Sequence, residues 1–335
     1  MAKSIDEIAK LAGVSVTSVR LVINGQDKKY RISEKTRAKI QSIIDEHGYY
    51  INQTARSLKL QRTQTLGLVV PRLTNPFFSQ LTEALEIRCR ESGYQLITVC
   101  SRDEAELEKQ VVENLIYRSV DGLFVTSSYQ SRQSDLLESH HGKPVVFLDR
   151  DFGIPNIAVV STNNLDGGKL LGRKMSGQLG ERQLIFMGAD EWLPTIQDRL
   201  EGLKAGLFEG GYQLSDGNVH FAERISRSHA YQKMSELYKS LRGPPDALVT
   251  PALPVLEGCL EYLKKEHGEI PRDMLIGSFD DHAMLGFLPN KVFAVRQNAT
   301  ELALEAYRIL EAMIRKDYPE QQKMVIMPEL ITYLE

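Results

Sequence analysis

The feature that most constrains the fold of this chain is a pattern that occurs twice in its larger part. An apolar segment of strand length begins at Leu66, an amphipathic helix follows it, and a turn starts 27 positions later at Gly93. The same plan begins at Leu184 and reaches a turn after 27 positions, at Gly211. Both turns read Gly-Tyr-Gln-Leu. Two copies of a strand–helix–strand unit predict two similar lobes, each with a parallel sheet covered by helices.

Short apolar segments continue the pattern through the rest of the chain. They are expected as strands at 123–126, 145–148, 247–250, 275–279 and 293–295, and the helix of the second copy is expected at about 195–209. Doubly wound lobes bind ligands in the crevice at the carboxyl ends of their strands. The loops that follow these strands are therefore where a binding site is expected.

The first 50 residues follow a different pattern, which predicts three short helices. Ser4 and Glu7 have the spacing of a capping box, which starts a helix at the following residue. Gly13 ends that helix in a tight turn, and Ser15 caps the next one. The helices are expected at 5–12, 16–24 and 33–47. Two short helices joined by a sharp turn and followed by a third are typical of a helix-turn-helix DNA-binding head.

The net charge of −3 conceals a basic head. Residues 1–62 hold 12 Lys and Arg against 6 Asp and Glu, a balance of +6, whereas the remaining residues hold 29 against 38, a balance of −9. A basic end on an acidic body favours contact of that end with nucleic-acid phosphates. Outward side chains expected to reach the major groove are Val16, Thr17, Ser18, Arg20 and Leu21, with Ser15 at the start of the helix. Those placed for phosphate contact are Asn24, Arg31, Ser33 and Thr36.

These patterns make residues 4–62 similar to the DNA-binding head of the lactose-repressor (LacI) family, and the similarity extends over essentially the whole chain. The matching stretches are Asp6-Glu7-Ile8-Ala9, Ala12-Gly13-Val14-Ser15, Val22-Ile23-Asn24-Gly25, Thr36-Arg37 and Gly48-Tyr49. The resemblance implies an all-α helix-turn-helix head and an α/β body of the periplasmic-binding-protein type, with two doubly wound parallel-sheet lobes. It also implies a homodimer that binds near-palindromic double-stranded operator DNA, with no membrane partner.

Between head and body lies a short polar segment that is compatible with a helix. Asn52 can cap it, and a helix this short is marginal alone in water, so DNA and a second subunit would have to support it. In the family this segment is the hinge helix. The resemblance implies that Leu58 is the apolar wedge between base steps of the minor groove and that Ala55 packs nearby.

Three parts of the chain are therefore expected. They are the head at 1–50, the hinge at 51–62, and an effector-binding and dimerisation body at 63–335. The first lobe of the body is expected at about 63–162 and 295–322, and the second at about 163–294 and 323–335.

The loops after the strands combine aromatic, hydroxyl, carboxylate and guanidinium side chains, a mixture that suits a polyhydroxylated ligand. By resemblance to the family, the effector site consists of Phe77, Phe78, Ser128, Asp149, Arg150, Arg199, Asp280 and Gln297. The two phenylalanines correspond to an apolar wall, and Ser128 and Gln297 to polar contacts. Asp149, Arg199 and Asp280 correspond to residues that bond hydroxyl or charged oxygens. An arginine at the position of Arg150 is less common in the family, and its presence here favours a phosphorylated ligand.

Each effector-site residue also has a purely structural alternative. Asp149 and Asp280 can be helix caps, the two phenylalanines can belong to the core, and Arg199 can form a surface ion pair. A departure from the family narrows the ligand, because Pro251-Ala252 stands where many sugar-binding members carry Asn-Asp. Fructose- and sucrose-responsive members also depart there, so fructose or a fructose phosphate is the expected effector. Another sugar or a purine corepressor is the alternative, and the sign of the response stays open.

Other classes of protein fit the sequence less well. His282 lies beside two aspartates, but the sequence contains no nucleophile elbow, phosphate-binding loop or metal-ligand spacing to accompany it. We therefore expect the protein not to be an enzyme and to have no cofactor and no metal site. A sugar-binding transport protein would share the body but not the basic head. The N-terminus has no signal-peptide stretch, and three distant cysteines are expected to be reduced, which favours a cytoplasmic, nucleoid-associated repressor.

Overall fold

The computed structural model describes residues 2–49, 62–139, 142–241, 243–317 and 322–333. The chain divides into two compact units, Met1–Thr63 and Gln64–Glu335, which are treated separately below. Within the described residues, no helix is both long enough and apolar enough to span a membrane.

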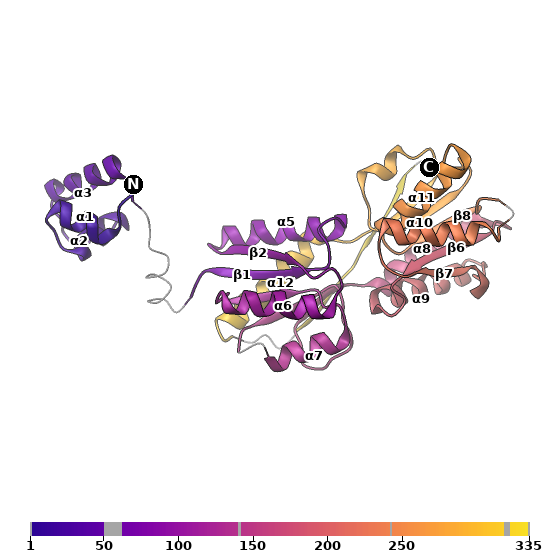
Figure 1. The fold of residues 1–335 in the computed structure, drawn as a ribbon, viewed down its shortest axis with the longest axis horizontal. Coiled ribbons are helices and arrows are strands. Elements are labelled where there is room, and N and C mark those ends of the chain that lie inside the picture. The colour runs from indigo at the N-terminus through magenta and orange to yellow at the C-terminus, as the bar shows by residue number, and fades with distance from the viewer. Residues whose placement is uncertain (1, 50–61, 140–141, 242, 318–321, 334–335) are drawn as a thin grey trace. The chain divides into compact units, whose positions relative to one another are not determined.

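The first unit is the predicted three-helix head (Figure 1). Its helices are α1 (Ile5–Ala12), α2 (Val16–Ile23) and α3 (Glu34–His47). The capping box is formed in both directions, because Ser4 Oγ accepts from the Glu7 backbone while the Glu7 carboxylate accepts from the Ser4 backbone. Gly13 ends α1 in the left-handed region at φ 63°. Ile8, Val19 and Ile40 from the three helices form a small buried core, which confirms the predicted head.

The first lobe of the second unit is a parallel sheet between two helical layers. Its strands are β1 (Thr65–Val70), β2 (Gln95–Cys100), β3 (Gly122–Val125), β4 (Val145–Leu148), β5 (Val159–Thr162) and β11 (Lys323–Ile326). They lie in the order β11-β5-β4-β3-β1-β2, and every neighbouring pair is parallel. Its helices are α5 (Pro76–Glu91), α6 (Ala105–Tyr117), α7 (Gln130–Ser139) and α12 (Ala299–Ile314). Helices α5 and α12 share one core with the sheet, and α6 and α7 share the other.

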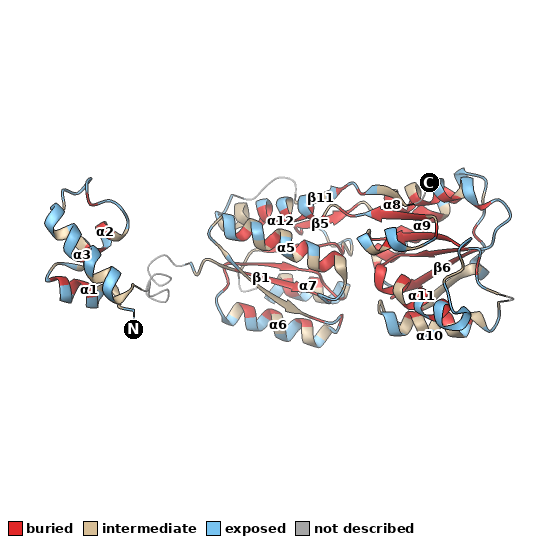
Figure 2. Ribbon diagram, turned by 90° about the horizontal axis from the view of Figure 1, so that it is seen from above, coloured by how far each residue is buried: buried red, intermediate tan, exposed pale blue. Residues whose placement is uncertain are grey.

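The second lobe repeats this plan. Its strands are β6 (Leu184–Ala189), β7 (Val219–Ala222), β8 (Ala247–Thr250), β9 (Leu275–Phe279), β10 (Val292–Arg296) and β12 (Glu329–Tyr333), in the order β12-β10-β9-β8-β6-β7. Its helices are α8 (Asn164–Leu179), α9 (Pro194–Glu209), α10 (Arg227–Tyr238) and α11 (Leu253–His267), with 3-10 turns η1 (Asp216–Asn218) and η2 (Ala283–Phe287). Figure 2 shows the strands of both sheets buried between helices whose outer faces are exposed.

The internal repeat is visible in the backbone itself. Gly93 and Gly211 have φ of 80° and 84°, and Tyr94 and Tyr212 each donate a backbone hydrogen bond to the preceding helix, over 2.8 and 2.9 Å. The copies diverge just afterwards. Strand β2 begins at once, whereas the extra turn η1 delays β7. The expected fold class is confirmed, with one local insertion in the second copy.

Two expectations about the lobes need correction. Strand β11 pairs with β5, and its Ile326 is buried in the first lobe, so residues 323–326 do not belong to the second lobe. Strand β10 pairs with β9 up to Val295, so the first lobe resumes later than residue 295. The second sheet is also not purely parallel. The chain enters β12 from the crevice edge, which makes this edge strand antiparallel to β10.

Candidate functional sites

Helix α2 has one face buried in the head and one face that is open. Val19 and Val22 are buried, whereas Thr17 and Arg20 are exposed and Val16, Ser18 and Leu21 are half-buried. The ion pairs in the described part of the head join Lys3 to Glu7, Arg37 to Asp27 and His47 to Glu46, and none of them involves Arg20. The outward face therefore offers a guanidinium fork, hydroxyls and a methyl-bearing surface, which are the groups that read base edges in a major groove.

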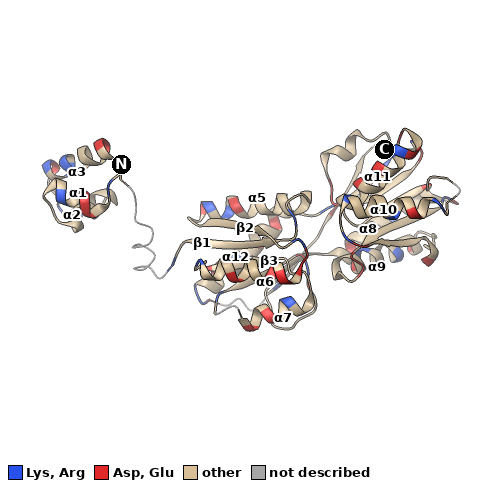
Figure 3. Ribbon diagram, viewed as in Figure 1, with Lys and Arg blue, Asp and Glu red and all other residues tan. Residues whose placement is uncertain are grey.

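The residues expected to contact phosphate lie at helix ends and in the adjoining turn. Ser15 Oγ accepts from the Ser18 backbone over 3.1 Å, and Ser33 Oγ accepts from the Thr36 backbone over 3.2 Å. These hydroxyls thus position the amino ends of α2 and α3, where free backbone N–H groups favour anions. Asn24 caps the end of α2, and the exposed Arg31 has a left-handed φ of 55°. Figure 3 shows basic positions along the helices of the head.

The expected hinge contacts Asn52, Ala55 and Leu58 lie outside the described residues. Their roles remain predictions from the family resemblance. Arg62, the last residue of the expected hinge, is the first residue that the structure describes again.

In the second unit, the carboxyl ends of both sheets line one crevice. Of the predicted effector residues, Phe77, Phe78, Asp149, Arg150, Arg199, Asp280 and Gln297 line its inner cavity. An outer cavity of about 280 Å³ shares Asn75, Phe78, Arg150 and Ile225 with the inner one, so the two form a continuous cleft. We call this space the effector cleft. The inner cavity has a volume of only about 20 Å³, so the cleft as a whole is at the small end of ordinary ligand pockets, which favours a small ligand.

Three aspartates occupy equivalent places in the fold, and two of them, Asp149 and Asp280, line the effector cleft. Asp149, Asp190 and Asp280 directly follow β4, β6 and β9, and their φ values are 65°, 45° and 63°. The left-handed region is costly for residues other than glycine, although Asp tolerates it best. Strained backbone of this kind persists where the surrounding structure enforces it, often at functional sites. Asp280 also accepts a hydrogen bond from the backbone of Leu253, the first residue of α11, so the structural alternative of a helix cap applies to Asp280 as well as the predicted role in the cleft.

Arg199 is the buried cation of the second lobe. Arg199 is 4% exposed. Its Nε donates to Asn164 Oδ1 over 2.7 Å, and its Nη1 donates to the Pro251 carbonyl over 2.6 Å. Its guanidinium carbon lies 4.6 Å from the centre of the Phe279 ring. These neutral partners fix the plane of the guanidinium without neutralising its charge. The alternative of a surface ion pair is therefore excluded.

Close approach of two helices positions Arg199. A Cβ atom added to Gly168 of α8 would lie 2.3 Å from the Arg199 carbonyl oxygen, so only glycine permits this backbone contact. Asn164, at the start of the same helix, holds the guanidinium. The second lobe therefore delivers Arg199 to the effector cleft on a rigid pair of helices.

Burial raises the pKa of the Asp149 carboxyl and that of the Asp280 carboxyl, while the nearby positive charge of Arg199 lowers both. Asp280 also accepts from Gln297 Nε2 over 2.6 Å, and Gln297 Oε1 accepts from Thr162 over 2.6 Å. Asp149 Oδ1 is buried and has no hydrogen-bond partner among the described atoms. A buried acceptor without a donor is costly, and a ligand hydroxyl would satisfy it.

Arg150 is the buried cation of the first lobe. It is 2% exposed, and its Nη1 lies 2.6 Å from Asp103 Oδ1 and donates to the Ser127 carbonyl over 3.1 Å. Its Nε has no partner among the described atoms. Asp103 pairs with one nitrogen of the guanidinium, and Nε stays available as a donor for an anionic ligand oxygen.

Ser128 is buried beside the cleft but does not line the inner cavity. Its backbone N–H donates to Glu108 Oε2 over 2.6 Å, and its Oγ has no partner among the described atoms. Burial raises the pKa of Glu108. Phe77 and Phe78 both belong to the core of the first lobe and also line the cavity, so they are core residues as the structural alternative had it, and their contact with the effector stays a prediction.

Sequence reasoning missed several residues of the cleft. Asp103, Ile225 and Thr195 line the cleft. Asn164 accepts a hydrogen bond from Arg199 and so orients its guanidinium. Asp103 comes three residues after β2, and this place after a strand of the parallel sheet is the signal in the sequence that indicates it. The partner of Arg199, Asn164, lies 35 positions away, and no spacing in the sequence indicates that pair.

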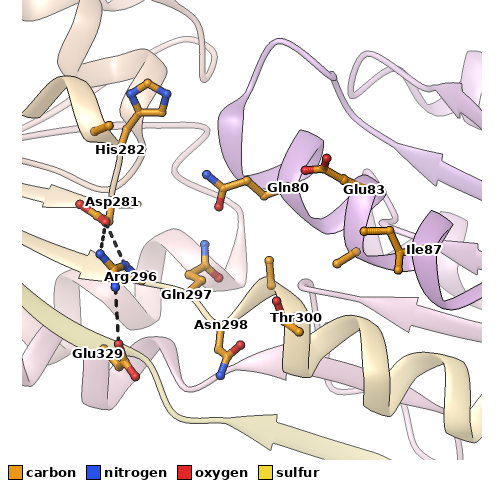
Figure 4. Close-up of a pocket in the computed structure, with 13 residues that line it drawn as sticks. Gln80, Glu83, Ile87, Asp281, His282, Arg296, Gln297, Asn298, Thr300 and Glu329 are labelled. Atoms are coloured by element: carbon orange, nitrogen blue, oxygen red, sulfur yellow. Dashed lines mark hydrogen bonds and ion pairs between the residues drawn. The ribbon is translucent and has the colours of Figure 1, made fainter.

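A second hollow of about 540 Å³ lies beside the segments where the chain crosses between the lobes (Figure 4). Arg296 Nη2 lies 2.7 Å from Asp281 Oδ2, and Arg296 Nη1 lies 3.8 Å from Glu329 Oε2. Gln297, which holds Asp280, lines this hollow as well as the effector cleft. A hydrogen-bonded path therefore runs from the cleft to the crossovers.

We expect Asp149→Asn to stabilise the ligand-free protein at pH 7 and to weaken its response to effector. Burial raises the folded-state pKa of Asp149, so the stability that its protonated form contributes below the unfolded-state pKa is lost as the pH rises through the folded-state pKa. An amide avoids this loss, and Tm should rise by roughly 2–4 °C at pH 7, with a smaller gain at pH 5. The effector concentration needed for half release of DNA should rise about tenfold. Differential scanning fluorimetry and a DNA-release titration measure the two effects.

Asp135→Asn on exposed α7 is the matched control, since its carboxylate pairs only with Arg132 at the surface. It should leave both quantities unchanged. A lower Tm for Asp149→Asn at pH 7 would show that the Asp149 carboxylate stabilises the empty cleft, contrary to this argument.

Known proteins resemble this chain along its length. Residues 4–52 match the family described as bacterial regulatory proteins, lacI family, and residues 66–317 match the periplasmic binding protein domain. The sucrose operon repressor of Klebsiella pneumoniae is 34% identical over 322 residues, covering 95% of this chain and 94% of that protein.

Solved structures resemble it as well. The Cra transcriptional dual regulator from Pseudomonas putida, in complex with fructose 1-phosphate, has a TM-score of 0.73 at 26% identity and covers 81% of this chain and 99% of that chain. The lac repressor dimer bound to operator and the anti-inducer ONPF has a TM-score of 0.82 over 99% of this chain and 98% of that chain. The sequence identity to the lac repressor is 20%, so this similarity shows a shared fold alone.

Proposed function

Because the chain belongs to the lacI family of bacterial regulatory proteins, we propose that it represses genes of sucrose or fructose use and is released from its operator by a fructose-type sugar phosphate. It acts as a homodimer in the cytoplasm, on nucleoid DNA. The two heads bind the halves of a near-palindrome in successive major grooves. The helix-turn-helix head separates this function from that of a sugar-binding transport protein, which shares only the body fold.

The observation that carries the proposal is that two buried carboxylates, one of them with an oxygen that has no partner among the described atoms, line the same small cleft as two buried arginines. Asp149 and Asp280 supply acceptors for sugar hydroxyls, and Arg199 and Arg150 supply donors for charged oxygens. Ala252 lines the cavity where many sugar-binding members of the family carry a polar residue. The names of two similar proteins, a sucrose operon repressor and a regulator in complex with fructose 1-phosphate, point the same way.

The test begins with an operator selected from random DNA by the purified full chain. Fluorescence anisotropy then measures operator affinity against fructose 1-phosphate, fructose, sucrose and hypoxanthine. We expect fructose 1-phosphate to weaken the complex more than about tenfold, which corresponds to the usual size of allosteric coupling. Affinity should also fall steeply with salt, because the head neutralises phosphates.

Two results would contradict the proposal. Equal operator affinity with and without each sugar would exclude all of them as effectors. Tighter binding with hypoxanthine would instead identify a purine corepressor, which is the alternative reading of the same cleft.

A further inference from the structure

A stack of aromatic rings joins the two lobes at one rim of the effector cleft. Trp192 follows β6 of the second lobe, and its ring lies parallel to that of Tyr129, which follows β3 of the first lobe, with centroids 4.2 Å apart and planes at 10°. Phe152, after β4, lies 6.5 Å from Trp192 at an interplanar angle of 7°. Offset or parallel stacking of this kind is favourable beyond the area that it buries.

A polar contact accompanies the stack. Arg224, after β7 of the second lobe, reaches Tyr129 Oη and Asp190 Oδ1, each over 3.5 Å. We call Tyr129, Phe152, Trp192 and Arg224 the clasp. Strands β6 and β7 lie at the edge of the second sheet away from β10 and β12, which lead into the crossovers. The clasp therefore joins the lobes where no covalent connection does.

The clasp is contiguous with the residues of the effector cleft. Phe152 follows Arg150, which lines the cleft, by two positions. On the other lobe, Leu193 lines the inner cavity beside Trp192. A movement that separates the lobes therefore breaks the stack and opens this side of the cleft together.

We propose that Trp192 closes one mouth of the effector cleft by stacking on Tyr129 across the lobes, and so positions the second lobe for effector binding. The inference rests on the proposed function, because it takes this cleft as the effector site. Trp192 is a positioning residue, since it acts through the approach of the lobes.

The clasp has the properties of a contact that forms and breaks. The Trp192 side chain stays 40% exposed, and the two Arg224 contacts are at the long limit for hydrogen bonds. An effector that needs closed lobes binds more weakly when the closed state is less populated, in proportion to that population. Loss of the stack should therefore raise the effector concentration needed for operator release.

The chain contains a single tryptophan, so its emission reports this contact alone. In the full-length protein without effector, Tyr129→Ala should shift the Trp192 emission to longer wavelength and increase its quenching by acrylamide. Fructose 1-phosphate added to the unmodified protein should reduce that quenching, as the lobes close further around the ligand.

Trp192→Ala tests the positioning role. The concentration of fructose 1-phosphate for half release should rise about fivefold to tenfold, and Trp192→Phe, which keeps a ring for stacking, should recover most of the loss. Phe208→Ala, at a 72% exposed ring on α9, is the matched control and should behave as the unmodified protein. Operator affinity without effector should stay within about twofold in all variants, which excludes unfolding as the cause.

Each outcome is decisive. Equal half-release concentrations for Trp192→Ala and Phe208→Ala would overturn the inference while leaving the proposed function intact. Failure of fructose 1-phosphate to release the unmodified protein would count against the proposed function, and the Tyr129→Ala emission would still decide whether the stack exists. Unchanged emission in that variant would overturn the clasp itself.

Discussion

Replacing Arg199 with methionine should give a repressor that binds its operator and no longer releases it. The guanidinium is buried, oriented by Asn164 and Pro251, and left without an anionic partner at hydrogen-bond distance in the described cleft. Hydrogen bonds to charged groups contribute about 1.5–3 kcal/mol each. Loss of two such bonds to the effector should raise the half-release concentration about a hundredfold or more. The anisotropy titration with fructose 1-phosphate measures it.

Two further variants define the cause. Arg199→Lys keeps the charge but loses the fork, so its response should lie between those of the methionine variant and the unmodified protein. Arg308→Met removes an exposed arginine that pairs with Glu305 on α12, and it should respond normally. A normal response from Arg199→Met would remove Arg199 from the effector site.

The second large effect is expected in the head. Arg20→Ala should weaken operator binding by about 10²- to 10³-fold, because each bidentate contact to a guanine is worth about 1–3 kcal/mol and a dimer makes it twice. Arg20 is exposed on the open face of α2 and is not engaged in an ion pair within the described head. Anisotropy with the selected operator and with a scrambled duplex measures both affinity and selectivity.

Charge and base reading can be separated at this position. Arg20→Lys should retain the salt dependence of binding while losing much of the preference for operator over scrambled DNA. Arg315→Ala, which removes an exposed body arginine paired with Glu311, should change neither. If Arg20→Ala weakened binding to both duplexes equally, Arg20 would be a phosphate contact instead.

The parts of this molecule that could be predicted from sequence are those fixed by local rules. Ser4, Gly13 and Ser15 locate the helices of the head because capping and left-handed turns depend on near neighbours. The carboxyl ends of strands likewise indicate Asp149 and Asp280, since parallel strands end at one edge.

What escaped prediction depends on distant parts of the chain. The pairing of Arg150 with Asp103 spans 47 positions, and the support of Arg199 by Asn164 depends on the close approach of α8 and α9. The placement of β11 in the first lobe depends on which core has room for Ile326, and an apolar strand pattern fits either sheet equally.

The interleaving of the lobes has a consequence for synthesis. The first sheet lacks its edge strand until Lys323–Ile326 leaves the ribosome, and the second lacks Glu329–Tyr333 until a few residues later. Neither sheet can therefore be completed before these late strands have been translated. The head is a separate unit that precedes both sheets in the sequence. A nascent chain can thus fold its DNA-binding head long before either sheet of the body is complete, so the part that binds DNA matures before the part that carries the cleft.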